Sequence, residues 1–196
     1  MLKEKDENQE LDKKKVEEKE FSWIREIVST GLYLLVVVAL TFLFVQYVGQ
    51  RTHVNGDSMN NTLENGDNLI VDKISYRFKD PERFDIIVFP YQYQEDTYYI
   101  KRIIGLPGET VQIEDGAIYI DGEVLEESYG KEVMYNAGIA SQPIELGEDE
   151  YFVLGDNREN SEDSRMADVG MVKRSYIYGK VWMVTSPKDH FRFIKH

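Results

Sequence analysis

The sequence predicts a mostly β protein, in which a single N-terminal transmembrane helix is followed by a coiled antiparallel, barrel-like β domain. Three observations predict this class. One uncharged apolar run near the N-terminus is long enough to span a membrane. Seven later runs are short, rich in β-branched and aromatic residues, and separated by turn-forming residues. No long stretch after the apolar run shows the apolar period of an amphipathic helix.

Residues 1–26 form a segment that cannot build a core. They include seven Lys or Arg and nine Asp or Glu, with hardly any apolar residue before Phe21. Segments with so much charge and so little apolar surface stay solvated. We therefore interpret residues 1–26 as a charged tail.

Residues 27–48 read IVSTGLYLLVVVALTFLFVQYV, without a charged residue. At about 1.5 Å per residue, a helix of this length spans a hydrocarbon core of roughly 30 Å. The residues that follow do not favour cleavage, because bulky Tyr47 would occupy the −3 position of a site ending at Gly49. We predict an uncleaved signal anchor in the lipid bilayer; a buried core helix is the alternative.

The distribution of Lys and Arg around this run predicts its orientation. Seven precede the run, whereas Arg51 is the only one between its end and Lys73. Positively charged flanks remain on the cytoplasmic side of a membrane. We therefore expect a single-pass type II protein of the cell membrane, with tail 1–26 cytoplasmic and residues 49–196 extracytoplasmic.

Residues 49–196 have the pattern of an antiparallel β domain. Turn signals at 114–116 and 121–122 bracket one short β-prone run and predict consecutive hairpins. The runs expected to form strands are 68–71, 85–90, 97–104, 110–113, 117–120, 151–154 and 177–184.

Composition excludes several kinds of function. The formal net charge is −13, from 36 acidic and 23 basic residues, and no basic patch is visible that would attract nucleic acid. The absence of cysteine excludes thiol catalysis, cysteine-ligated zinc and disulfides. With three histidines, a histidine-based metal site is not expected. Catalytic groups must come mainly from hydroxyls, lysines and carboxylates, and we expect neither metal nor cofactor.

Ser58 lies in a passage rich in Gly, Asn and Asp, VNGDSMNNTL, ten residues after Val48. Ten residues of chain reach at most about 35 Å, so we expect this serine near the membrane surface. A serine in such a turn is by itself usually a turn residue. A lysine later in the chain strengthens the case for catalysis.

Lys101 lies inside the β-prone run YYIKRIIG. The alternation of a strand places Tyr99, Lys101 and Ile103 on one face and Arg102 on the other, so one of the two adjacent cations is expected in apolar company. Burial lowers the pKa of an ammonium group, and a lysine with a pKa of about 7–8 is able to accept a serine proton. The alternative is a lysine that extends its ammonium group into solvent.

A third passage, GDNRENSEDSR at 155–165, follows an apolar run and is dense in short polar and charged side chains. We expect an ordered loop closed by an ion pair, either Asp163 with Arg165 or Asp156 with Arg158. The spacing of its oxygen ligands does not fit a calcium-binding hand.

Together these passages resemble the type I signal peptidases, membrane-bound Ser/Lys proteases that remove signal peptides from exported proteins. GDSMNNTL at 56–63 resembles the nucleophile box of that family, and RFDIIVF at 83–89 resembles the strand box that follows. YIKRIIGLPGETV at 99–111 resembles the lysine box, and 155–165 the final box. The boxes occur in the family's order behind one N-terminal span.

The resemblance implies a serine endopeptidase that cleaves secretory preproteins after small-x-small sites at the outer face of the membrane. It implies that Ser58 is the nucleophile and Lys101 the general base, without a cofactor. The family's oxyanion hole uses the backbone N–H of the nucleophile, and some members add a serine hydroxyl where this chain has Gly56. The residues implied to support the site without reacting are Asp163, Arg165, Asp156 and Ser164.

Two positions depart from the family's pattern. The family usually has proline where this chain has Asn61, and glycine in the strand box where this chain has Phe84. Without the proline the turn after Ser58 is expected to be looser, and Phe84 adds bulk near the site. We expect a changed rate or substrate preference.

Three other functions fit some of these residues. A membrane-tethered scaffold that kept the fold but lost catalysis would fit the departures at Asn61 and Phe84. A Ser/Lys self-cleaving regulator shares the dyad, but would carry a DNA-binding domain, which the acidic charge disfavours. A Ser/His/Asp hydrolase would use His53, His190 or His196, of which the last two lie in an expected surface end of the chain.

One internal segment imitates a cleavage site. Gly138, Ile139 and Ala140 form a small-x-small triplet in the expected loop 135–145. Self-cleavage after Ala140 is therefore an alternative to an ordinary loop.

Overall fold

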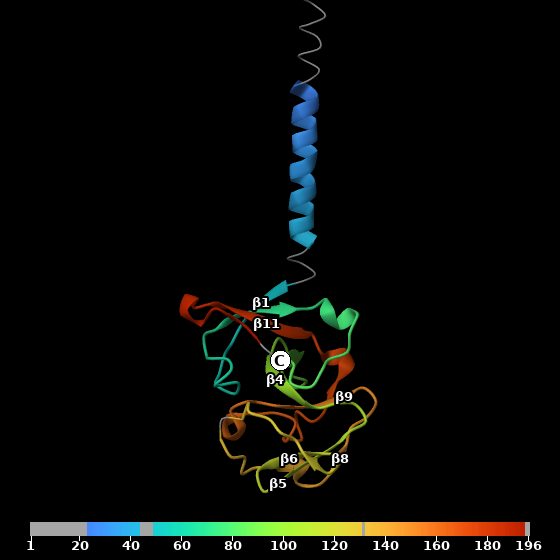
Figure 1. Ribbon diagram of the computed structural model, residues 1–196, viewed down its shortest axis with the longest axis vertical. Helices are drawn as coiled ribbons and strands as arrows, with labels where there is room; N and C mark the ends of the chain where they lie inside the picture. Colours follow the sequence, from blue (N-terminus) through green and yellow to red (C-terminus); the bar gives the residue numbers. More distant parts are fainter. Residues whose placement is uncertain (1–22, 44–48, 131, 195–196) are drawn as a thin grey trace, which may run out of the picture. The chain divides into compact units, whose positions relative to one another are not determined.

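The computed structural model describes residues 23–43, 49–130 and 132–194. The chain divides into two units, residues 1–46 and 47–196 (Figure 1). The first unit contributes a helix, and the second contributes all of the described strands. The mostly β class that the sequence predicts is confirmed.

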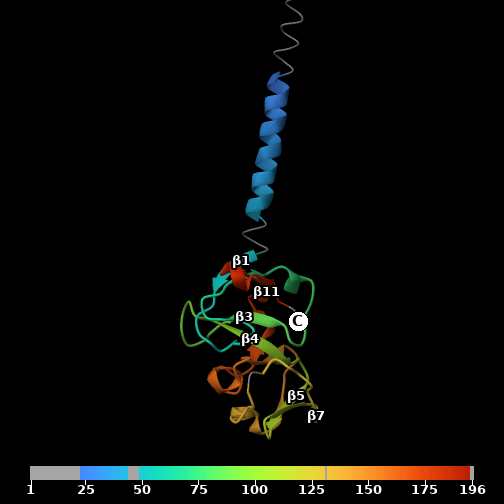
Figure 2. The same cartoon turned by 60° about the vertical axis from the view of Figure 1, so that its left-hand side comes forward.

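Two antiparallel sheets make up the second unit (Figures 1 and 2). Among the described residues, the larger sheet contains β1 (Gly49–His53), β2 (Asn68–Asp72), β3 (Ile86–Pro90), β4 (Tyr98–Gly105), β9 (Glu150–Leu154), β10 (Val172–Lys173), β11 (Gly179–Ser186) and β12 (Arg192–Phe193). Its strand order is β1-β2-β11-β3-β4-β9-β10, with β12 paired to β11. Strand β4 is internal, because it pairs with β3 on one side and β9 on the other.

The smaller sheet follows the chain order of its hairpins. It contains β5 (Thr110–Glu114), β6 (Ala117–Ile120), β7 (Glu123–Val124) and β8 (Ile144–Glu145), in the order β7-β6-β5-β8. Gly116 and Gly122 occupy its turns with φ of 80° and 84°, a conformation that favours glycine. The described 3-10 helices are η1 (Ser75–Arg77), η2 (Gly138–Ser141), η3 (Arg158–Asn160), η4 (Arg174–Tyr176) and η5 (Lys188–His190).

Alternation along β3 divides the core of the larger sheet. Ile86 and Val88 pack into one cluster of buried residues, whereas Ile87 and Phe89 pack into another together with Ile103 of β4. Apolar surface is therefore removed from water on both faces of the sheet, which stabilises the fold and buries β3 and β4. A third cluster lies around β5 and β6.

All seven runs predicted as strands form strands, with ends shifted by at most two residues. The five strands that the sequence did not predict are β1, β7, β8, β10 and β12. Four of them are two residues long, and β1 reads GQRTH, without the apolar alternation of a half-buried strand.

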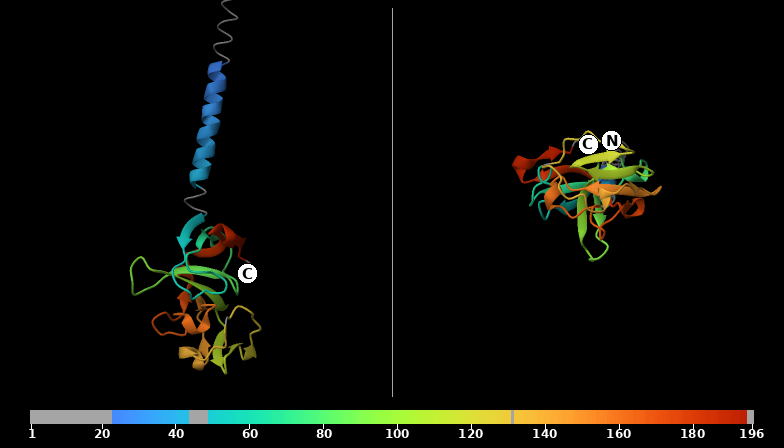
Figure 3. Two further views of the ribbon diagram at one scale, coloured as in Figure 1. Left: turned by 90° about the vertical axis from the view of Figure 1, so that its left-hand side faces the viewer. Right: turned by 90° about the horizontal axis from the view of Figure 1, so that it is seen from below.

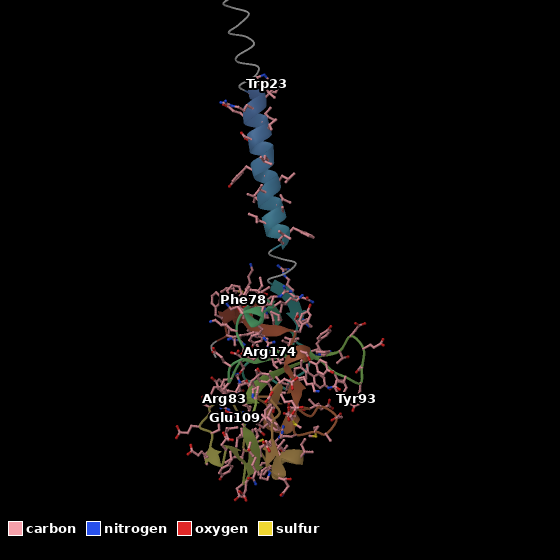
Figure 4. All side chains as sticks on the ribbon, turned by 90° about the vertical axis from the view of Figure 1, so that its right-hand side faces the viewer. Trp23, Phe78, Arg83, Tyr93, Glu109 and Arg174 are labelled. Atoms are coloured by element: carbon pink, nitrogen blue, oxygen red, sulfur yellow. The ribbon has the colours of Figure 1, made fainter. Side chains whose placement is uncertain are left out.

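The connection between β3 and β4 stands away from the rest of the second unit (Figure 3). Tyr93, which is 72% exposed, lies on this connection (Figure 4). Tyr91 stacks on Tyr99 with ring centroids 4.7 Å apart, and its hydroxyl donates a hydrogen bond to Asp168 at 2.9 Å. These contacts tie the base of the connection to the segment that follows the 155–165 loop.

The triplet that imitates a cleavage site lies in η2. Ala140 is fully buried, and a Cβ added to Gly138 would lie 2.2 Å from the carbonyl oxygen of Arg165. A protease binds its substrate as an extended strand. This 3-10 turn, with Ala140 buried and Gly138 and Ile139 exposed, does not present such a strand, which favours the interpretation as an ordinary loop.

The helix of the first unit runs from Trp23 to Leu43 and is long and apolar enough to cross a membrane. Its side chains are exposed and project on every side (Figure 4). Its first described residue, Trp23, lies four residues before the predicted span, and charged Arg25 and Glu26 separate Trp23 and Ile24 from the uncharged run. The end of that span, 44–48, and most of the predicted tail, 1–22, lie outside the described residues.

Candidate active site

The structure brings Ser58 and Lys101 together. Ser58 lies in the connection between β1 and β2, and Lys101 lies in β4. The Nζ atom of Lys101 is 2.8 Å from the Oγ atom of Ser58, which is hydrogen-bonding distance. The two candidate residues are therefore neighbours in space, although 43 positions separate them in the sequence.

We call residues 54–67 the Ser58 loop. A backbone hydrogen bond of 2.8 Å, from the N–H of its first residue to the carbonyl oxygen of its last, closes its base. After Ser58 the chain makes a tight turn, in which the N–H of Leu63 donates to the carbonyl oxygen of Met59 at 2.8 Å. Both of these side chains are buried in the core. The burial of these two apolar side chains anchors the turn. Asn61 lies inside the turn, at the position where the family usually has proline.

Lys101 is buried, with 4% of its surface exposed. Its Nζ lies 5.0 Å from the centroid of the Tyr99 ring and 3.2 Å from the carbonyl oxygen of Ile100. Burial lowers the pKa of Lys101 from 10.5 to about 8, and nearby carboxylates, that of Asp163 most strongly, oppose the shift. A lysine with this pKa is partly neutral near physiological pH, so it is able to accept a proton.

Arg102 is buried as deeply as its neighbour, but it is fully paired. Its Nε and Nη2 donate to the two carboxylate oxygens of Asp156 at 2.9 and 2.7 Å, and both side chains are completely buried. The same carboxylate accepts a hydrogen bond of 2.5 Å from the Thr62 hydroxyl, in the Ser58 loop. A buried charge needs such partners. The pair therefore connects β4, the 155–165 loop and the Ser58 loop.

The 155–165 loop also holds the Ser58 loop through the main chain. The N–H and the side-chain amide of Asn157 donate to the carbonyl oxygens of Ser58 and its predecessor, at 3.0 and 3.1 Å. Gly155 permits this approach, because a Cβ there would lie 2.5 Å from the Ser58 carbonyl oxygen.

The buried hydroxyl of Ser161 lies beside Gly155. It would be only 2.2 Å from a Cβ at Gly155, and it has no hydrogen-bond partner among the described residues. Sequence reasoning did not single out Ser161.

The ion pair predicted between Asp163 and Arg165 is present and buried. The Nε and Nη2 atoms of Arg165 lie 2.8 and 2.9 Å from the carboxylate oxygens of Asp163. Asp163 also accepts the N–H of Gly155 at 3.1 Å, and the Ser164 hydroxyl oxygen accepts the N–H of Val153 at 2.9 Å. These bonds fasten the loop to β9.

The alternative pair, Asp156 with Arg158, is wrong. Asp156 pairs with Arg102, 54 positions away, and Arg158 pairs with Glu127 at 2.9 Å. The sequence predicts that one of the two adjacent cations in β4 lies in apolar company, whereas both are buried. Spacing along the sequence predicts ion pairs between charges that are close in the chain. In the structure, Asp156 and Arg158 instead pair with residues of other elements.

Phe84 shows why glycine is usual at its position. Its φ is 72°, in the left-handed region that a side chain disfavours. The ring packs against Tyr129 with centroids 5.1 Å apart, and the Tyr129 ring lies 3.6 Å from the guanidinium carbon of Arg102. The bulk expected near the site thus forms an aromatic cover over the buried ion pair.

The histidines lie apart from this dyad. The Nδ1 atom of His190 is 2.8 Å from a carboxylate oxygen of Asp67, so the expected surface end of the chain in fact packs against the Ser58 loop. His53 is exposed in β1, and His196 lies outside the described residues. The hydrogen-bond partner of the Ser58 hydroxyl is Lys101.

A serine hydroxyl beside a buried lysine amine, in a loop anchored by two other elements, is an arrangement that is able to support nucleophilic catalysis. Comparison with known proteins identifies a family of peptidases. Residues 24–185 match the family model described as signal peptidase, peptidase S26. This family match covers both the apolar helix and most of the β unit.

Curated relatives carry the same name. The chain is 36% identical over 180 residues to a probable signal peptidase I-2 of Synechocystis, covering 89% of this chain and 78% of that protein. It is 34% identical over 202 residues to signal peptidase I T of Bacillus subtilis, covering 100% of both. A crystal structure of a signal peptidase I from Enterococcus faecalis matches with 38% identity and a TM-score of 0.42, over 52% of this chain and 97% of that one. The family match over residues 24–185 and the curated relatives show that the chain belongs to the type I signal peptidase family, a family of peptidases.

Proposed function

We propose that this chain cleaves N-terminal signal peptides from exported preproteins, with Ser58 as nucleophile and Lys101 as general base. The observation that carries the proposal is the 2.8 Å approach of the Lys101 amine to the Ser58 hydroxyl, inside a site that buries the lysine. Family membership supplies the substrate class. The geometry supports the roles of the two residues.

The chemistry follows from the protonation state of Lys101. The neutral amine takes the proton of the Ser58 hydroxyl as its oxygen attacks the carbonyl carbon of the −1 residue. The backbone N–H of Ser58 stabilises the oxyanion that forms. The Lys101 ammonium then protonates the leaving amine, and the peptide bond breaks to give an acyl-enzyme. The neutral amine next activates a water molecule, which hydrolyses the ester and releases the signal peptide.

Substrate selection is proposed to depend on small residues at −1 and −3. An extended segment that pairs with a strand edge alternates its side chains, so these two residues point toward the same side and enter the enzyme's pockets. Small pockets reject larger side chains by steric exclusion. Cleavage after Ala-x-Ala, and its loss when either alanine becomes phenylalanine, would support this selection.

The decisive experiment is cleavage of a preprotein with an Ala-x-Ala site by the detergent-solubilised full chain. We expect the wild type and His53→Ala to cut after the second alanine, as shown by sequencing the new N-terminus. We expect Ser58→Ala and Lys101→Ala to be inactive although folded, by circular dichroism. Activity retained in Ser58→Ala would refute the proposed nucleophile. A folded wild type that cleaves no such preprotein would favour the scaffold alternative.

We further propose that residues 1–26 are cytoplasmic and residues 49–196 extracytoplasmic. The chain has no cysteine, so single-cysteine variants report topology without background. Tyr135, 83% exposed in the β unit, and Lys13, in the tail, are suitable positions. A membrane-impermeant maleimide should label Tyr135→Cys in intact cells and Lys13→Cys only after permeabilisation. The reverse pattern would refute this orientation.

A further inference from the structure

The C-terminal segment, residues 188–194, contacts the base of the Ser58 loop through a buried carboxylate. Asp67 is completely buried, and its Oδ1 lies 2.8 Å from the Nδ1 of His190. Its Oδ2 accepts the N–H of Glu64 at 3.0 Å and lies 3.5 Å from the Nη2 of Arg192. A buried carboxylate is costly unless it is paired and hydrogen-bonded. The C-terminal segment supplies two of the three groups that satisfy it.

Arg192 also reaches the turn that follows Ser58. Its Nη2 donates a hydrogen bond of 2.6 Å to the carbonyl oxygen of Thr62. The N–H of Thr62 donates to Met59 at 2.8 Å, and its hydroxyl donates to Asp156 at 2.5 Å. Thr62 is therefore held from two sides, by the C-terminal segment at its carbonyl and by the 155–165 loop at its hydroxyl.

Four positions separate Thr62 from Ser58, and both residues belong to the same hydrogen-bonded turn. A displacement of the turn moves Ser58 relative to Lys101, which sits on a different element. A misplacement of about 1 Å at a reacting group costs up to about 100-fold in rate. Groups that fix the turn therefore control the approach of the two reacting atoms.

We propose that Arg192 and His190 are positioning residues, which hold the Ser58 loop in the geometry that brings Ser58 to Lys101. The proposal rests on the proposed function, because it assigns the C-terminal segment a part in that reaction. It assigns no proton transfer to His190. Arg192 fixes the turn after Ser58, and His190 fixes the base of the loop at Asp67.

The position of His190 makes part of this contact dependent on pH. In the described part of the chain, the charged groups facing its ring are Asp67 and Glu64 from the Ser58 loop, Asp189 from its own turn, and Arg192 from β12. The hydrogen bond to Asp67 raises the pKa of His190 above 6.5. The charged contact is therefore complete below about pH 6.5 and weakens as the pH rises through the raised pKa.

The test compares variants of the full chain in detergent, with the preprotein of the cleavage assay as substrate. Arg192→Gln removes the charge, and Arg192→Lys restores a cationic donor. His190→Leu removes the hydrogen bond, and His190→Asn keeps an amide donor near the position of Nδ1 without a titrating group. Lys188→Gln is the matched control, because it removes an exposed charge from the same segment.

We expect Arg192→Gln to lower kcat by about 10- to 100-fold while KM changes by less than about twofold, because a displaced nucleophile affects chemistry more than binding. Arg192→Lys should recover part of the loss. His190→Leu should lower kcat, and His190→Asn should recover it. The dependence of kcat on pH in His190→Asn should lack the part that comes from the titration of His190. Lys188→Gln should match the wild type.

A second measurement does not depend on activity. Hydrogen exchange followed by mass spectrometry should show faster exchange of the 59–63 amides in Arg192→Gln than in the wild type or Lys188→Gln. Should Arg192→Gln fail to fold, Arg192→Lys and His190→Leu allow the same comparison. If wild-type protein cleaves no preprotein, or Ser58→Ala remains active, the proposed function fails and the exchange rates alone decide the role of the segment.

Two outcomes would overturn this inference. The first leaves the proposed function intact, and the second revises the set of reacting residues. Wild-type kcat and wild-type exchange in both Arg192→Gln and His190→Leu would show that the segment does not position the loop. Complete loss of cleavage in every His190 variant, His190→Asn included, would make His190 a reacting group rather than a positioning residue.

Discussion

Lys101 and Arg102 are adjacent in β4 and both are buried, yet their surroundings on the two faces of the strand differ. Arg102 forms a fully buried ion pair with Asp156. In the portion of the chain that the structure describes, Lys101 has no ion pair, and its polar contacts are the Ser58 hydroxyl and the Ile100 carbonyl. Burial with a matched anion makes a cation a structural element. Burial without one lowers the pKa of the cation, so that it is able to accept a proton near neutral pH.

The energetic consequence differs accordingly. A fall in the pKa of Lys101 from 10.5 to about 8 corresponds to about 3 kcal/mol of destabilisation of the folded state at neutral pH. Strongly shifted pKa values of this kind cluster at functional sites. The Arg102–Asp156 pair instead joins three elements around the site, so its loss should affect folding before it affects chemistry.

The largest expected effect comes from Lys101→Met. Cleavage should fall by about 10³- to 10⁴-fold, because the general base is lost and methionine cannot accept a proton. The fold should survive, since a thioether side chain of similar length fills the same buried space. Steady-state rates on an Ala-x-Ala preprotein measure the loss. Cleavage by Arg102→Lys is the control, because it shows how much of the loss follows from changing either of the two buried cations.

The same variant tests the cost of burying an unpaired lysine. Below about pH 8, Lys101→Met should be more stable than the wild type by about 1–3 kcal/mol in urea unfolding. The difference should fade between about pH 8 and 10.5, because wild-type Lys101 is then neutral in the folded state and takes up a proton on unfolding less and less as the pH approaches 10.5. A variant less stable than the wild type at pH 7 would contradict the comparison with Arg102.

The next effect is the opposite response at Arg102. Arg102→Met should destabilise the fold by about 3–5 kcal/mol, because it leaves the buried carboxylate of Asp156 without its charge partner. Urea unfolding at constant pH measures the change. The double variant Arg102→Met with Asp156→Leu removes both charges and should recover most of the loss. Equal destabilisation by the single and double variants would mean that the pair itself is not what holds these elements together.

How much of this contrast the sequence predicts depends on the range of the interactions. The strands are predictable because alternating apolar residues such as Ile86 and Ile87 report a local, two-residue period. The same alternation predicts that one of the adjacent cations Lys101 and Arg102 lies in apolar company, without deciding which. The local pattern proposes the Asp163–Arg165 pair as one of two pairings, and the resemblance selects Ser58 as nucleophile and Lys101 as base. All of these rest on signals contained within short stretches of chain.

The partners of the buried charges are not predictable in this way. Asp156 binds Arg102 at a separation of 54 positions, and His190 binds Asp67 at a separation of 123. Such pairings depend on the order of strands in the sheet, which places distant segments side by side. Local spacing instead suggested the wrong partner for Asp156 and a free surface end around His190.

A smaller effect concerns the pH dependence of cleavage. The value of kcat/KM should rise with pH and level off above about pH 8, because Lys101 must be neutral to act as a base. Glu162→Gln removes a carboxylate that raises the pKa of Lys101, so the rising limb should move to lower pH. The Tyr99 hydroxyl, 2.6 Å from Glu162, retains an acceptor in the amide. A limb near 10.5, or one that Glu162→Gln leaves in place, would show that Lys101 is not the titrating base.

The smallest effect lies at Phe84, on the Arg102 side of the strand. Phe84→Ala keeps a Cβ at a φ of 72° and loses the ring that packs on Tyr129 over Arg102, so it should be less stable than the wild type by about 1 kcal/mol. Phe84→Gly loses the same ring but relieves the left-handed strain, and should be more stable than Phe84→Ala by about 1 kcal/mol. Thermal unfolding of both variants separates ring packing from backbone strain. If Phe84→Gly proved the less stable of the two, the glycine usual in the family would have another cause. The Phe84 ring covers the paired charge of Arg102 and, among the described hydrogen bonds and ring contacts, makes none with Lys101. Neither Phe84 variant should therefore shift the pH at which kcat/KM rises.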